Sequence, residues 1–175
     1  MKFKTCCFTG HRDIPTDPAF QGQLQDILDE TIQKLIGMGV RYFGTGGARG
    51  FDTMAALSVL KMREKHPNIS LILVLPCVEQ TRGWKISDVV QYNQIKSTAD
   101  KVVYTSREYT KGCMHRRNRH LVDNSDICVA YCTKNTGGTT FTVSYAHQKG
   151  IPVIQLAQMM GSQNKTDLYS LVQKF

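Results

Sequence analysis

Short apolar runs alternate along the chain with longer segments in which apolar residues recur every three or four positions. The short runs predict strands, and the longer periodic segments predict amphipathic helices. Strands are expected at residues 3–9, 40–45, 70–75, 101–104, 127–131 and 152–156. Helices are expected at residues 18–36, 52–65, 87–97, 112–124, 139–148 and 167–174. Asp17 and Pro18 form a start signal for the first helix, and Gly37 and Gly39 stop it.

The run SLILVL at residues 70–75 is apolar without alternation, which is typical of a strand covered by helices on both faces. Six strands separated by helices predict an α/β fold of the Rossmann-like type, with a doubly wound, mainly parallel sheet and helices on both faces. The 175 residues contain no repeat and no low-complexity linker, so we expect a single domain over residues 1–175.

This architecture also predicts where a ligand binds, because ligands of open α/β sheets lie beyond the carboxyl ends of the strands. Glycine, hydroxyl and charged residues follow four of the expected strands, in segments 10–12, 44–52, 76–84 and 136–142. All four segments are therefore expected at one edge of the sheet.

The segment GTGGARGFD follows the second expected strand. Gly46, Gly47 and Gly50 allow the backbone to approach a phosphate closely at a helix N-terminus, with Arg49 as a candidate phosphate ligand. Asp52 is a candidate for capping the helix or for binding a ribose hydroxyl. The alternative is a tight glycine turn without a ligand, since the spacing matches neither a Walker A loop nor GxGxxG.

A second glycine turn follows the fifth expected strand and contains Gly137, Gly138, Thr139 and Thr140. Small residues and hydroxyls at the start of a helix can donate hydrogen bonds to a phosphate without side-chain bulk. The alternative is a flexible loop with Thr139 as the helix cap.

The expected helix at residues 112–124 carries the densest cluster of basic residues in the chain. Its apolar face is formed by Met114, Leu121 and Val122. Asn118 falls on this stripe and Arg117 lies beside it, which makes Arg117 the candidate clamp for a phosphate or carboxylate and Asn118 a second polar group of the site. The solvated side is expected to carry Arg116, Arg119 and His120. A basic surface without a ligand is the alternative.

His11 and Arg12 follow Gly10 at the end of the first expected strand. An arginine in this place suits an anion site, and two exposed side chains are the alternative. Trp84, the only tryptophan, lies in a loop with Glu79. It can stack on a base, cover the site or pack in a satellite cluster.

The net charge of +8 favours phosphorylated or polyanionic partners. The six cysteines include no CxxC pair, and Cys128 and Cys132 lack a histidine pair at ligand-like spacing, so we expect reduced, structural thiols and no metal. No apolar run is long enough to span a membrane and no signal-peptide pattern is present, so we expect a cytoplasmic protein without a membrane partner.

Three ordered motifs carry a family resemblance: GARGFDT at residues 47–53, RRNR at 116–119 and GTTFT at 138–142. Over nearly its whole length the chain resembles the SLOG superfamily, named for the Smf/DprA and LOG proteins. TGHR at residues 9–12 and Trp84 are most similar to its YpsA-like branch. The resemblance implies a Rossmann-like domain that binds a nucleotide or nucleotide-derived ligand, such as ADP-ribose, NAD or a nucleoside monophosphate such as AMP.

The LOG branch hydrolyses the N-glycosidic bond of nucleoside monophosphates with an arginine on one helix and the glutamate of a PGGxGTxxE motif. Arg117 matches the arginine, but Phe141 and Thr142 stand where the glutamate is expected. A LOG-like phosphoribohydrolase is therefore an alternative function, in which Asp52 or Glu79 substitutes for the missing carboxylate. Its catalytic candidates are Arg117, Asp52 and Glu79.

The DprA branch binds single-stranded DNA, and GARGFD and RRNR look closest to its versions of the motifs. A single-stranded DNA-binding module is the second alternative, although such proteins usually combine a basic groove with several aromatic platforms. Our first expectation is a protein that binds or senses a small phosphorylated ligand, with nucleic acid as the alternative partner. Homodimers are common in the family, which makes a homo-oligomer an expectation as well.

Overall fold

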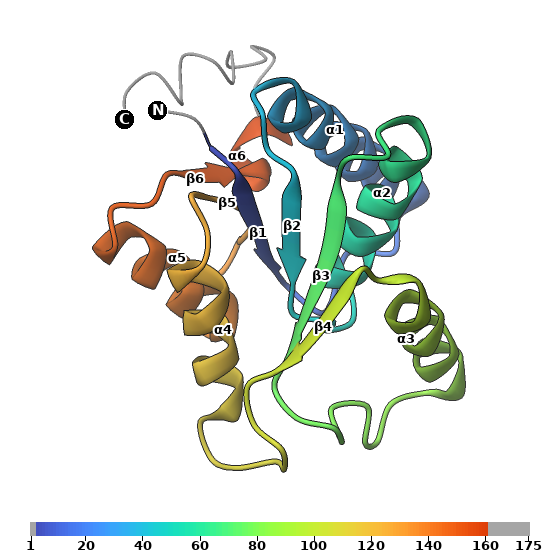
Figure 1. Cartoon of the computed structure of the whole chain (residues 1–175), viewed down its shortest axis with the longest axis vertical. Helices are drawn as coiled ribbons and strands as arrows, with labels where there is room; N and C mark the ends of the chain where they lie inside the picture. The colour runs from blue at the N-terminus through green and yellow to red at the C-terminus, as the bar shows by residue number, and fades with distance from the viewer. Residues whose placement is uncertain (1–2, 161–175) are drawn as a thin grey trace.

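The computed structural model describes residues 3–160, and this part of the chain contains six strands and six helices (Figure 1). The strands are β1 (Thr5–Gly10), β2 (Tyr42–Thr45), β3 (Ser70–Leu75), β4 (Lys101–Tyr104), β5 (Ile127–Tyr131) and β6 (Val153–Gln155). The helices are α1 (Pro18–Gly37), α2 (Phe51–Lys65), α3 (Ile86–Thr98), α4 (Cys113–Asp123), α5 (Gly138–Gln148) and α6 (Leu156–Met160).

All strand pairs in the sheet are parallel, and the strand order is β4-β3-β2-β1-β5-β6. From β1 the chain builds outward through β2 and β3 to β4, and it then returns through α4 to place β5 on the other side of β1. The expected Rossmann-like, doubly wound sheet is confirmed. The direction of winding reverses between β1 and β5, so this is the switch point at which such sheets bind ligands.

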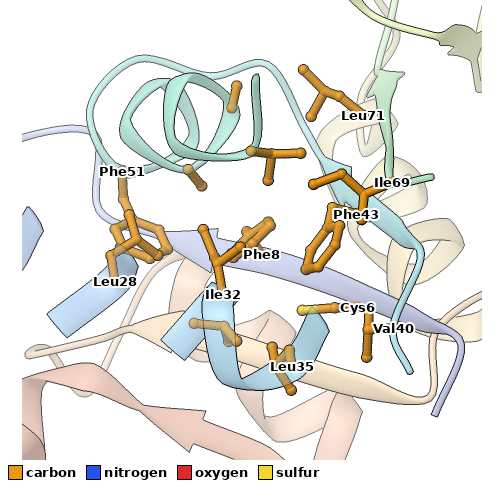
Figure 2. Close-up of a cluster of buried hydrophobic side chains, with 14 of the residues drawn as sticks. Cys6, Phe8, Leu28, Ile32, Leu35, Val40, Phe43, Phe51, Ile69 and Leu71 are labelled. Atoms are coloured by element: carbon orange, nitrogen blue, oxygen red, sulfur yellow. The ribbon is translucent and has the colours of Figure 1, made fainter. Parts of the chain in front are cut away.

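Helices cover both faces of the sheet (Figure 1). On one face α1, α2, α3 and α6 enclose the larger core, in which Phe8, Phe43 and Phe51 pack together with leucines and isoleucines of α1 and β3 (Figure 2). On the other face α4 and α5 cover a smaller core that includes Cys7 and Leu121. Successive residues of β1 alternate between the two cores, because side chains of a strand point to opposite faces in turn.

Helix α1 begins as the sequence predicts. The Asp17 carboxylate accepts a hydrogen bond of 2.9 Å from the Phe20 N–H, and Pro18 occupies the first turn, where its missing N–H is not needed. The helix ends at Gly37, and Gly39 has φ of 105°, a conformation that favours glycine.

Several predicted boundaries differ from the structure. Phe3 and Val40 are buried but precede β1 and β2. An apolar run indicates that residues are buried, and it does not show where the hydrogen bonding between strands begins. The last predicted strand is shorter than expected, and Leu156 begins α6, which the sequence did not predict. The helix predicted at residues 167–174 lies outside the described residues.

The six cysteine thiols are free, and all of them except that of Cys132 are buried. Within residues 3–160, no helix combines the length and the apolar character that crossing a bilayer requires.

Candidate functional site

A cavity of about 220 Å3 lies at the switch point between β1 and β5. Four segments meet there: the end of β1, the loop before α2, helix α4 and the start of α5. The site residues expected from the sequence that line the cavity are Gly10, His11, Arg12, Asp52, Arg117, Asn118, Gly138 and Thr139. The carboxyl edge of the sheet thus brings together side chains that are more than 100 residues apart in the chain.

Arg117 is the buried cation of this cavity, with 5% of its surface exposed. Its Nη1 donates a hydrogen bond to the Gly46 carbonyl, and its Nε donates to Asn118 Oδ1 over 2.8 Å. Burial lowers the pKa of Arg117, and the nearby charge of Asp52 opposes that shift. No protein group in the described structure accepts a hydrogen bond from Nη2, which leaves this nitrogen available to a ligand oxygen.

The position of Arg117 on its helix corrects the sequence interpretation. Arg117, rather than Asn118, lies on the buried stripe of α4, four residues after Cys113 and four before Leu121. Asn118 is half-buried beside this stripe. The interpretation was wrong because it used Met114 to mark the inward face, whereas the small, apolar Cys113 occupies that place. Arg116 and Arg119 are exposed, as expected.

Asp52 is the carboxylate of the same cavity and is 6% exposed. Its Oδ2 accepts a hydrogen bond of 3.1 Å from the Ala48 N–H. Burial raises the pKa of Asp52, and the Arg117 charge opposes the rise. Of the two roles considered for Asp52, capping of α2 is wrong, because Gly50 occupies the N-cap position and no side chain caps the helix. The carboxylate holds the preceding loop instead.

The glycines of GTGGARG allow other atoms of the protein to lie close to the backbone of this loop. The Gly46 carbonyl accepts hydrogen bonds from Arg117 and from Gln80 Nε2, the latter at 3.0 Å, and a Cβ on Gly46 would overlap the guanidinium. Gly47 and Gly50 have φ of 67° and 73°, and a Cβ on Gly50 would overlap the Arg12 carbonyl. Gly46 and Gly47 do not line the switch-point cavity. The loop is therefore a tight turn that shapes the cavity wall.

Arg49 lies apart from Arg117. Its guanidinium lies over the Trp84 ring at 5.7 Å from the ring centroid, and its Nη1 is 3.9 Å from Asp88 Oδ2. With Gly50 it lines a larger groove of about 480 Å3 between α1, α2 and α3. The structure does not bring Arg49 to the switch-point cavity.

His11 joins the ends of the two central strands. Its Nε2 accepts a hydrogen bond of 2.8 Å from the Thr133 N–H, just beyond β5. An acceptor role requires an unprotonated Nε2, so the ring is neutral with its proton on Nδ1. Burial lowers the pKa of His11, and the charge of Lys134 lowers it further.

The second glycine turn contributes the start of α5 to the cavity. Gly137, with φ of 106°, occupies the N-cap position, and Gly138 and Thr139 line the cavity. The positive end of the helix dipole is thus placed at the cavity wall. Thr139 does not cap the helix, because the N-cap is Gly137 and no side chain caps it. Thr140 donates its hydroxyl hydrogen to the Lys134 carbonyl at 2.9 Å and does not line the cavity.

Trp84 and Glu79 lie in an adjoining cavity of about 380 Å3. Arg12 and Met114 line both cavities, so they form the wall between them. Gln80 also lines the second cavity, although it was not among the site residues expected from the sequence. A single glutamine in a loop carries no spacing signal, and its role depends on the distant Gly46 carbonyl.

The arrangement can hold an anion and offers one buried carboxylate beside it. Arg12 and Arg117 line the switch-point cavity together with the start of α5, and Asp52 is its single acidic residue among those described. Over residues 3–160, no group of three or more histidine, cysteine, aspartate or glutamate side chains is arranged to hold a metal ion.

A Rossmann-like domain with a cationic cavity at its switch point defines the class of this protein. The model of the YspA SLOG family matches residues 7–158, and the chain belongs to this family. Similar proteins include the SPbeta prophage-derived protein YoqJ of Bacillus subtilis, which is 29% identical over 137 residues covering 71% of this chain and 80% of YoqJ. The UPF0398 protein BH1768 of Halalkalibacterium halodurans is 30% identical over 129 residues, covering 72% of this chain and 68% of that protein.

A solved structure of DNA processing protein A from Helicobacter pylori has the same fold. It matches 98% of this chain and 80% of its own with a TM-score of 0.65 and 17% identity. That structure was described for its mode of binding single-stranded DNA.

Proposed function

We propose that this protein binds or senses a nucleotide or nucleotide-derived ligand, such as ADP-ribose, NAD or a nucleoside monophosphate, at the carboxyl edge of its sheet. The observation that carries the proposal is the buried Arg117 guanidinium at the switch point, with Nη2 unused by the protein. A phosphate oxygen can accept from a guanidinium N–H and from the N–H groups of a helix N-terminus together.

The size of the site supports a nucleotide rather than an isolated phosphate. The switch-point cavity is small, but it adjoins the Trp84 cavity across Arg12 and Met114. Their combined volume falls in the roughly 300–1,000 Å3 range of small-ligand sites. A phosphate in the first cavity therefore has room for its nucleoside in the second.

Isothermal titration calorimetry with ADP-ribose, NAD, AMP and ribose 5-phosphate tests the proposal. We expect binding that Arg117→Met weakens at least about tenfold, because it removes the charged donor. Arg119→Met, on the exposed side of the same helix, is the matched control and should bind as the wild type does. Absence of heat with every one of these ligands at millimolar concentration would exclude the proposed function.

Hydrolysis of the N-glycosidic bond is a second candidate, favoured by one observation. Asp52 is a buried carboxylate whose pKa burial raises, and a raised pKa suits a carboxyl group that gives or takes a proton. Thr142, near the place of the LOG-type glutamate, is buried and donates its hydroxyl hydrogen to the Gly138 carbonyl. Free base released from AMP by the wild type but not by Asp52→Asn would support this activity, and no release would exclude it.

Binding of single-stranded DNA is the third candidate, favoured by the likeness to DNA processing protein A. The exposed side of α4 carries Arg116 and Arg119, which are cations of the kind that contact phosphates. An oligonucleotide should then bind with an affinity that falls steeply as salt rises, and Arg116→Met with Arg119→Met should reduce that dependence. An oligonucleotide that does not bind at low salt would exclude this candidate.

A further inference from the structure

Arg12 is a second cation of the site, and among the described residues it has no carboxylate partner. Its exposed side chain lines both the switch-point cavity and the Trp84 cavity. Within residues 3–160 the guanidinium forms no ion pair, and its contact with a protein acceptor is a long one of 4.0 Å from Nη2 to Met114 Sδ. A thioether is a weak acceptor, so the guanidinium keeps its donors for a ligand.

The glycine loop fixes the backbone that carries Arg12. A Cβ on Gly50 would overlap the Arg12 carbonyl, so the loop packs on this residue only with a glycine there. The preceding carbonyl, that of His11, accepts a hydrogen bond of 3.1 Å from the Phe51 N–H at the start of α2. Arg12 is therefore held in place through its main chain, while its guanidinium stays available at the wall between the two cavities.

A separate set of donors lies around Arg117. Asn118 Oδ1 accepts from Arg117 Nε, so the orientation of the amide is set and Nδ2 remains as a donor. A Cβ built on Gly138 would lie 3.9 Å from this Nδ2, which places it at the start of α5. No side chain caps α5, and the N–H groups of Gly138 and Thr139 lie in its first turn, where a helix offers no acceptor. Together with Arg117 Nη2, these groups can all donate to one phosphate.

The two guanidinium groups also interact through their charges. Burial lowers the pKa of Arg117 most, the Asp52 charge opposes this shift, and the Arg12 charge lowers the pKa further. Among the described residues that line the switch-point cavity, Asp52 is the single carboxylate beside these two cations. Like charges that lie close together disfavour each other, so an anion that contacts both cations relieves this repulsion.

We infer that the site takes a nucleotide with a diphosphate group rather than a nucleoside monophosphate. One phosphate lies in the switch-point cavity against Arg117, Asn118 and the start of α5. The second lies against Arg12, and the nucleoside follows in the Trp84 cavity. A monophosphate leaves one of the two donor sets without an anion. This inference rests on the proposed function, because it assigns a second phosphate to a ligand whose first phosphate Arg117 binds.

ADP-ribose and AMP allow a direct comparison, because they carry the same base and a similar total charge. Each phosphate of ADP-ribose carries one negative charge, and the monoester phosphate of AMP carries close to two at about pH 8. Calorimetry with the full chain therefore measures the effect of a second phosphate at nearly constant charge. We expect ADP-ribose to bind about tenfold more tightly than AMP. ADP should bind at least as tightly as ADP-ribose, since it has the same two phosphates.

Variants of Arg12 test which residue binds the second phosphate. Arg12→Met should lower the affinity for ADP-ribose to that for AMP and leave the affinity for AMP within about twofold of its wild-type value. Arg12→Lys keeps the charge and should retain part of the affinity that Arg12→Met loses. Lys65→Met removes one exposed cation at the far end of α2 and is the control, which should bind both ligands as the wild type does. Thermal denaturation checks that each variant is folded.

The outcomes distinguish this inference from the function on which it rests. Equal affinities for AMP and ADP-ribose would overturn the diphosphate site and leave the proposed function standing. ADP that binds no more tightly than AMP would overturn it too, because the gain in ADP-ribose would then come from its second ribose. The same loss for both ligands in Arg12→Met would place Arg12 on the phosphate that they share, which also contradicts the inference. If none of the three ligands binds, both proposals are wrong.

Discussion

The guanidinium of Arg117 occupies the space that a side chain on Gly46 would need. The Gly46 carbonyl accepts a hydrogen bond from Arg117 Nη1, and a Cβ on residue 46 would lie 2.5 Å from Cζ of the guanidinium. The glycine loop and the arginine helix, 71 residues apart, therefore determine each other's position. The wall of the switch-point cavity depends on this contact.

Gly46→Ala should destabilise the protein because the added methyl group has to displace a buried, hydrogen-bonded guanidinium. We expect a loss of about 1–3 kcal/mol in the free energy of unfolding, measured by urea denaturation. Gly22→Ala is the matched control, since a Cβ on Gly22 meets nothing within 4 Å and the residue lies inside α1. That control should gain roughly 0.5–1 kcal/mol. If Gly46→Ala were as stable as the wild type, Gly46 would not pack closely against the Arg117 guanidinium.

Arg117 and Asp52 should prove energetically coupled. Burial disfavours the charged form of each, and each charge opposes the pKa shift of the other. Arg117→Met removes the stronger of the two nearby cations of Asp52, Arg117 and Arg12, and leaves the Gly46 carbonyl without this donor, so it should cost about 1–3 kcal/mol. In the double variant Arg117→Met/Asp52→Asn part of this loss should return, giving a coupling of about 0.5–3 kcal/mol in a double-mutant cycle of urea denaturations. Strictly additive effects would show that the two charges do not interact.

The fold could be predicted because the buried strands β3 and β5 are continuous apolar runs, apart from Ser70 at the start of β3. β3 and β5 lie at the residues that the apolar runs predict, and the strand ends bring the two glycine turns to one edge. Helix α6 could not be predicted, because five residues are too few to show a helical period. The predicted topology alone was enough to place three residues at that edge: Arg12, Asp52 and Arg117.

The details of the site could not be predicted, because they depend on contacts between distant segments. Burial of Arg117 depends on the Gly46 carbonyl, which accepts a hydrogen bond from its guanidinium. The sequence around residue 117 contains no sign of this distant partner. Arg49 belongs to the glycine motif, but it lies over Trp84, 35 residues later. Gln80 acquires its role from the same Gly46 carbonyl.

The start of α1 offers a test of the fold that is independent of the site. Asp17→Ala removes the acceptor for the Phe20 N–H and should lower the free energy of unfolding by about 0.5–2 kcal/mol. Asp26→Ala removes an exposed carboxylate within the same helix and should change stability by less than about 0.5 kcal/mol. Thermal or urea denaturation of the two variants measures the difference, and equal stability would show that Asp17 is not the cap.

His11 should make the stability of the protein depend on pH. Its folded-state pKa is lowered from 6.5 by burial and by Lys134, so the unfolded chain binds the proton more readily than the folded one. The stability that neutral His11 contributes is therefore present above pH 6.5 and is lost as the pH falls through the folded-state pKa. Protonation also removes the lone pair that accepts the Thr133 N–H.

Urea denaturation between about pH 7.5 and about pH 5 measures this dependence. The wild type should lose stability over that range, and His11→Ala should lose less, because the titrating group is absent. His147→Ala removes an exposed histidine on α5 and should keep the slope of the wild type. A His11→Ala slope as steep as that of the wild type would mean that another group titrates. In that case the link between the ends of β1 and β5 would not depend on the neutral His11 ring.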